Sequence, residues 1–115
     1  MADLSQLAAS HLAAAKADER GRSPELLVHD GPLRQTIIAL VAGTELGEHN
    51  SPDAASIQVL LGRVSVTGSE TVELGAGRLA VLTHDRHSVR ALEDSVFLLT
   101  TVTSVGQTAE PQRGR

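Results

Sequence analysis

Residues 43–62, GTELGEHNSPDAASIQVLLG, decide the fold of this chain. The stretch begins and ends on glycine, carries His49 near its middle, and finishes with the apolar run IQVLL. A short apolar run that stops at a glycine is typical of a β-strand with buried side chains, because strands are short and turns favour glycine. The stretch therefore predicts a loop followed by a strand over residues 56–61.

Similar short segments, rich in Val, Ile, Leu and Thr and separated by glycine-containing turns, follow one another along the chain. The clearest hairpin joins RVSVT to TVEL through Gly68, Ser69 and Glu70, and Val64 and Val66 alternate with polar residues as in a strand with one wet face. About eight short strands predict an all-β jelly roll or barrel. We expect them over residues 25–29, 35–41, 56–61, 63–67, 71–74, 78–82, 88–92 and 95 to about 105.

The amino-terminal residues 3–19 have a different period. Asp3 is placed to cap a helix, and Gly21 with the Ser23-Pro24 pair would end it. The apolar positions have helical spacing, and they are Leu4, Leu7, Ala8, Leu12 and Ala15. We therefore expect a helix and linker over residues 1–22, a barrel over 23–105, and a flexible tail without apolar periodicity over 106–115.

The spacing within residues 43–62 resembles the first motif of the cupin superfamily. That motif runs glycine, five residues, His-x-His, three or four residues, glutamate, six residues, glycine. Gly43, His49 and Gly62 keep their places in this chain, whereas Ser51 stands at the second histidine and Ala55 at the glutamate. This chain keeps the spacing of the motif but only one of its three metal-binding side chains, His49.

A second segment is similar to the second cupin motif, roughly glycine, five residues, Pro-x-Gly, two residues, histidine. Gly77 is matched, Thr83 and Asp85 replace the proline and glycine, and His87 comes one residue early. The resemblance covers about residues 34–105 and is closest to small single-domain bacterial cupins. It implies a single cupin barrel, a double-stranded β-helix or jelly roll, with the short N-terminal helix packed outside.

In the cupin family the two histidines and the glutamate of the first motif, with the histidine of the second, converge on one metal ion. Carried over residue by residue, only His49 and His87 remain. Two imidazoles are too few for a stable zinc or iron site, which takes at least three protein ligands. The expected cofactor is therefore none, or one divalent transition metal with a third ligand from Asp53, His84, Asp85 or Glu48.

We interpret His49 and His87 as neutral polar residues in a small cavity at the mouth of the barrel, hydrogen-bonded to each other, to backbone or to water. The other expected lining residues are Ser51, Ala55, Ile57, Val59, Val64, Val66 and Leu82. His11, on the predicted helix, and His29, before the Asp30-Gly31-Pro32 turn, are expected to be solvated.

Composition excludes several classes of function. The chain has no cysteine, which excludes disulfides, a thiol nucleophile and any sulfur-ligated metal centre. Its net charge is −4 and its Lys and Arg residues are scattered, so we expect no nucleic-acid and no membrane partner. With one Phe and no Trp or Tyr, the core must consist of aliphatic side chains. We expect a cytoplasmic location, because the sequence shows no signal peptide or membrane span.

The nearly continuous apolar runs IQVLL and VFLLTTV require cover on both faces, by the core and by a helix or a second subunit. We expect a homodimer that buries the outer face of IQVLL or of the strand over residues 35–41, with Gln58 facing away from the barrel interior. Three functions remain: a cupin-domain protein that binds a small molecule, a metal-dependent enzyme acting on a small organic acid or sugar derivative, and a non-enzymatic assembly or regulatory partner.

Overall fold

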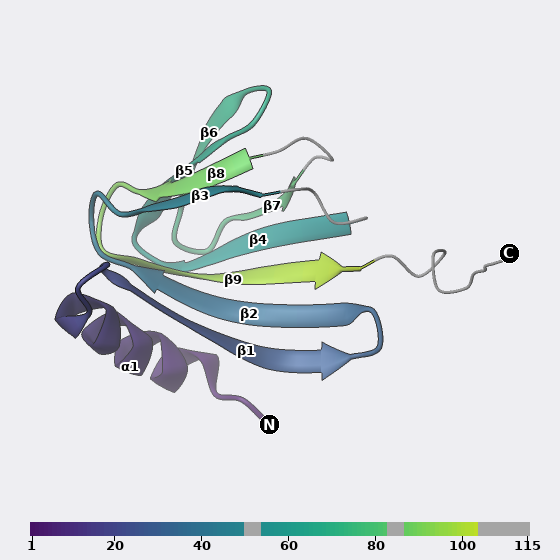
Figure 1. Cartoon of the computed structure of the whole chain (residues 1–115), viewed down its shortest axis with the longest axis horizontal. Coiled ribbons are helices and arrows are strands. Elements are labelled where there is room, and N and C mark those ends of the chain that lie inside the picture. The colour runs from purple at the N-terminus through teal and green to yellow at the C-terminus, as the bar shows by residue number, and fades with distance from the viewer. Residues whose placement is uncertain (50–53, 83–86, 104–115) are drawn as a thin grey trace, which may run out of the picture.

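The computed structural model of the chain consists of two antiparallel β-sheets packed face to face, with one helix on the outside (Figure 1). It describes residues 1–49, 54–82 and 87–103, apart from the side chains of Glu48 and His49. One sheet has the strand order β1-β2-β9-β4-β7 and the other β3-β8-β5-β6. The elements are α1 (Leu4–Ala17), β1 (Arg22–Asp30), β2 (Leu33–Leu40), β3 (Glu45–His49), β4 (Ala54–Leu61), β5 (Arg63–Thr67), β6 (Thr71–Gly75), β7 (Leu79–Leu82), β8 (His87–Ala91) and β9 (Ser95–Val102). This is the predicted cupin-type barrel with a short N-terminal helix.

The larger hydrophobic core lies between the inner faces of the two sheets. On β4, Ile57 and Val59 are fully buried while Gln58 between them is only half-buried, so Gln58 lies on the outward row as the alternation predicts. Apolar residues from both sheets meet in this core, namely Ile38, Leu40, Ile57, Val59, Leu82 and Phe97 from the first sheet and Val64, Leu74, Val89 and Ala91 from the second. Their packing holds the two layers together.

A smaller cluster covers the outer face of the five-stranded sheet. Helix α1 begins where the Asp3 side chain accepts a hydrogen bond from the Gln6 N–H at 3.1 Å, and it buries Ala8 and Ala15. These alanines pack against outward residues of β2 and β9, which are Ile37, Ala39, Val96 and Leu98. The apolar outer face of the strand predicted over residues 35–41 is therefore covered by the helix of the same chain. The homodimer remains a prediction.

The strand boundaries agree with the sequence except where the apolar signal is weak. Strand β5 has the predicted bounds, β1 is longer than predicted at both ends, β8 begins at His87, and β9 ends at Val102. Strand β3 was not predicted as a strand, because its sequence ELGEH has a single apolar side chain and no alternation. It forms by pairing with β8. The tail predicted over residues 106–115 lies outside the described residues.

Tight turns fill one end of the barrel, where the β2–β3, β4–β5 and β8–β9 connections meet; we call it the closed end. The buried Ser95 side chain accepts a hydrogen bond from the Arg63 N–H at 3.0 Å, and its hydroxyl lies 2.7 Å from the carbonyl oxygen of Glu93. The Asp94 carboxylate accepts a hydrogen bond from the Ala42 N–H at 2.8 Å. Within the described part of the chain, no helix is long and apolar enough to cross a membrane.

Candidate functional site

The opposite end of the barrel, which we call the pocket end, carries the two histidines that the sequence singles out. His49 and His87 are directly opposed in the antiparallel pairing of β3 with β8. Between Leu46 and His49, β3 contains one more residue than the matching part of β8, which is a bulge in the ladder. Opposed residues of such a pair have Cα atoms about 4.5–5.5 Å apart. The backbone therefore brings together two positions from distant parts of the sequence, while the His49 side chain lies outside the described structure.

A pocket of about 240 Å³ opens at this end between the β5–β6 hairpin and β7, and His87 is part of its wall. Three of the residues expected to line a cavity, Val66, Leu82 and His87, line this pocket. The rest of the wall consists of Gly68, Ser69, Glu70, Val72, Leu74, Ala80 and Val81. The sequence predicts the Gly68–Glu70 segment only as a turn, although the alternation of Val72 and Leu74 marks an inward-facing row next to it.

Other expected lining residues lie elsewhere. Ile57, Val59 and Val64 face the barrel interior but are fully buried in the packed core, since side chains such as Phe97 fill the space there. Ala55 belongs to the wall of a second hollow of about 280 Å³, which it shares with Ser56, Val81, Leu82, Thr100, Val102 and Ala54. Ser51 lies outside the described residues.

The pocket wall is mainly aliphatic, with a few polar groups. The His87 imidazole, the Glu70 carboxylate and the Ser69 hydroxyl are the side chains in the wall that can form hydrogen bonds. A neutral imidazole has one donor and one acceptor nitrogen, whereas a carboxylate only accepts. Such a wall suits a small molecule with an apolar body and at least one hydroxyl, amide or amine group.

The described residues do not make up a metal centre. Ala55, at the position of the motif glutamate, has only a methyl group and cannot bind a metal. Among the residues that the structure describes there is no group of three or more His, Asp or Glu side chains able to hold an ion. The expected third ligands Asp53, His84 and Asp85, and the side chain of Glu48, lie outside that part.

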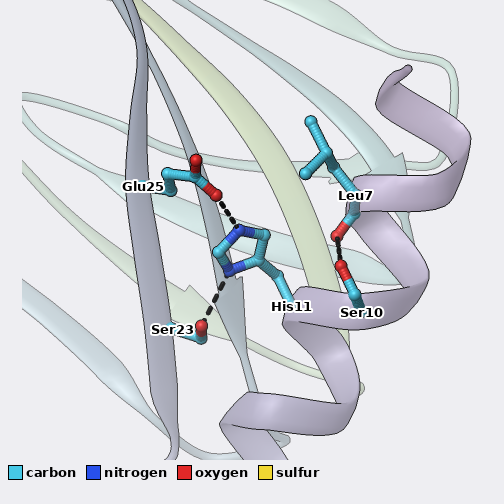
Figure 2. A network of polar contacts seen from close by, with 5 residues as sticks. All are labelled: Leu7, Ser10, His11, Ser23 and Glu25. Carbon is cyan, nitrogen blue, oxygen red and sulfur yellow. Dashed lines mark hydrogen bonds and ion pairs between the residues drawn. The ribbon is translucent and has the colours of Figure 1, made fainter. Parts of the chain in front are cut away.

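The expectation that His11 is solvated is wrong, because its side chain is only 13% exposed. Its two ring nitrogens contact Ser23 and Glu25 on β1 (Figure 2). The sequence did contain a signal for this burial: His11 follows Leu7 by four residues and Ala8 by three, so it lies on the apolar face of the helix. His29 is exposed, as expected, with Nε2 3.1 Å from Arg34 Nη2.

The fold is similar to that of several solved structures. A conserved protein of unknown function from Streptococcus pyogenes is 26% identical, with a TM-score of 0.70 over 77% of this chain and 80% of that one. An RmlC-like cupin protein from Desulfovibrio desulfuricans is also 26% identical, with a TM-score of 0.63 over 70% of this chain and 81% of that one. A cupin superfamily protein from Desulfitobacterium hafniense has a TM-score of 0.71 at 14% identity, over 81% and 87% of the two chains. No protein-family model and no curated protein matches the sequence.

Proposed function

This chain is a small member of the cupin superfamily, and from that premise we propose that it binds a small molecule in the pocket at the end of its barrel. The observation that carries the proposal is the pocket of about 240 Å³, which combines an aliphatic wall with the His87 imidazole. Ligand sites are typically concave and mostly apolar, with a small number of polar groups that orient the ligand. The wall of this pocket has that composition.

The volume and the lining limit the ligand. Pockets for drug-sized molecules measure about 300–1,000 Å³, so this one suits a smaller compound. Val66, Leu74 and Leu82 would contact its apolar body, and His87 would form a hydrogen bond with a hydroxyl or amide group. The register of β3 with β8 supports a second imidazole, that of His49, near the same ligand.

The first experiment uses cyclohexanol as the probe, because it has an apolar ring and one hydroxyl group. We expect methyl NMR signals of Val66 and Leu82 to shift on titration in the millimolar range, since so few atoms give weak binding. Val66→Phe should abolish the shifts at Leu82 by filling the pocket, while Leu26→Phe, at an exposed site on β1, should leave them unchanged. Shifts spread over the whole chain, or equal in both variants, would contradict the proposal.

A second candidate is a metal-dependent enzyme that acts on a small organic acid or a sugar derivative. The opposed positions of His49 and His87 favour it, because they would supply two ligands from adjacent strands. The test is the metal content of protein purified without added metal. Near-stoichiometric zinc, iron, manganese, copper or nickel that is lost in both His49→Ala and His87→Ala would favour this candidate over metal-free binding. Absence of metal from the parent would count against it.

A homodimer is also part of our proposal, and its surface differs from the one that the sequence suggested. Leu60 on β4 packs against the cluster under α1, whereas Leu79 and Val81 on the edge strand β7 are 67% and 81% exposed. We propose that a second copy covers these two side chains. Leu79→Asp should give a monomer in sedimentation velocity, and Leu26→Asp on the opposite edge strand should not. A monomeric parent, or a dimer that survives Leu79→Asp, would exclude this interface, leaving the assembly or regulatory role without its surface.

A further inference from the structure

A second group of polar side chains lies outside the barrel, where α1 packs on β1 (Figure 2). His11 Nδ1 is 2.7 Å from Ser23 Oγ, and His11 Nε2 is 2.7 Å from Glu25 Oε1. The imidazole is largely buried, with 13% of the side chain exposed, while Glu25 is 50% exposed. Ser23 is half-buried. None of these residues belongs to the pocket described above.

The chemistry of the three groups fixes the direction of the hydrogen bonds when the imidazole is neutral. A carboxylate only accepts hydrogen bonds, so His11 Nε2 carries the proton and donates it to Glu25. Nδ1 is then an acceptor, and the Ser23 hydroxyl donates to it. The serine proton therefore points at a base, and the base is oriented by a carboxylate.

We propose that Ser23 is a nucleophilic serine, with His11 as its general base and Glu25 as the residue that positions His11. In an acyl transfer, Ser23 Oγ would form a bond to the acyl carbon, and His11 Nδ1 would take the serine proton and pass it to the departing group. Water would then attack the acyl-serine with the help of His11, releasing the acid and restoring the hydroxyl. An activated ester is the class of reagent that such a site would take. The inference is independent of the pocket and of its ligand.

Ser10 on α1 provides an internal comparison. Its hydroxyl donates to the carbonyl oxygen of Leu7 at 3.2 Å, and a carbonyl oxygen does not take up the proton at neutral pH (Figure 2). Ser10 is exposed whereas Ser23 is half-buried, and the two serines differ in the group that accepts their proton. A higher reactivity at Ser23 despite its lower exposure would report on His11, whereas a purely structural link between α1 and β1 would leave Ser23 the less reactive of the two.

The chain has no cysteine, so single-cysteine variants give a clean test. Ser23→Cys and Ser10→Cys are treated separately with iodoacetamide; a sulfur–carbon bond forms, iodide leaves, and the thiol proton passes to the base. We expect Ser23→Cys to react at least tenfold faster, because an imidazole at hydrogen-bond distance favours the thiolate. Adding His11→Gln should lower the rate to that of Ser10→Cys. Equal rates in the two single-cysteine variants would overturn the proposal.

The parent protein is then labelled with a fluorophosphonate, in which an oxygen–phosphorus bond forms at the serine and fluoride leaves as the base takes the proton. Peptide mass spectrometry should find the label at Ser23, and Glu25→Gln should slow labelling severalfold. This substitution keeps an acceptor for His11 Nε2, so circular dichroism should show an unchanged fold. No label at Ser23 would mean that the three residues only fasten α1 to β1, and a rate that Glu25→Gln leaves unchanged would overturn the positioning role of Glu25.

Discussion

The two ends of this barrel are built by the same strands and differ in how they are filled. At the closed end, Gly62 approaches the backbone of Asp94 and the side chain of Ser95 so closely that it leaves no room for a Cβ atom. At the pocket end, Val66, Leu82 and His87 line about 240 Å³ of open space. The comparison separates residues that are needed for folding from residues that are available for binding.

Strand β5 runs between the two ends and shows the transition in one row of side chains. Val64 is fully buried in the core, while Val66, two residues further along the same face, is half-buried and lines the pocket. The local sequence pattern does not distinguish the two valines, since both alternate with polar residues. Their different surroundings come from strands far away in the sequence, so substitutions at the two ends should have very different costs.

The largest expected effect is at the closed end, for Gly62→Ala. The residue has φ 79°, which disfavours any side chain, and a Cβ would overlap Asp94 and Ser95. Strain and overlap together should lower the free energy of unfolding by about 3 kcal/mol in urea denaturation. The matched control is Gly43→Ala, where φ is 88° and no atom lies within 4 Å, so only about 1 kcal/mol should be lost. Equal losses would show that overlap is unimportant.

The next effect is expected for Ser95→Ala. The substitution removes the acceptor of the Arg63 N–H and the hydroxyl that donates to the carbonyl oxygen of Glu93, at a cost of about 2 kcal/mol. Thermal or urea unfolding measures the change. Ser56→Ala, on the outward row of β4, should change stability by less than about 0.5 kcal/mol. A comparable cost at both serines would mean that the Ser95 hydrogen bonds do not stabilise the closed end.

A smaller effect is expected for Asp94, which makes two different contacts. Its Oδ1 accepts the Ala42 N–H at 2.8 Å, and its Oδ2 lies 3.7 Å from Lys16 Nζ on α1. The ion pair is exposed and should contribute less than about 0.5 kcal/mol, whereas losing the hydrogen bond should cost about 1 kcal/mol. Asp94→Asn, which keeps an oxygen for Ala42, should therefore be milder than Asp94→Ala in urea unfolding. Equal losses in the two variants would mean that the ion pair, which both substitutions remove, contributes more than the hydrogen bond.

The closed end and the layered core could be predicted from the sequence because their signals are local. Alternation in RVSVT, the apolar run IQVLL and the glycine at position 62 give the strands and their turn, and Asp3 with the alanine-rich stripe gives the helix. Strand β3 could not be predicted, since its residues have no apolar period and it is held by pairing with β8. Strand β3 can therefore be identified only from its contact with β8, a distant segment of the sequence.

The candidate site was predicted less completely, for a similar reason. The spacing of the motifs located His49 and His87, whose Cα positions prove to be opposed. Alternation located the inward row of β4 and β5, but it could not show that Ile57 is packed while Val66 borders open space. That distinction depends on which side chains the facing sheet contributes. The spacing from Leu7 and Ala8 places His11 on the apolar face of the helix, but its partners Ser23 and Glu25 come from β1 and could not be found from the helix alone.

The smallest effect on stability is expected for Val66→Phe, and this variant tests the difference between the two ends of the barrel most directly. Val66→Phe adds a ring where about 240 Å³ is open, so the free energy of unfolding should change by less than about 0.5 kcal/mol. Val64→Phe adds the same ring to a fully packed position and should cost about 2 kcal/mol or more. Urea denaturation of the two variants measures the difference. Only a wall with open space beside it can accept a larger side chain without strain. If Val66→Phe costs as much as Val64→Phe, the two ends of β5 are therefore packed alike.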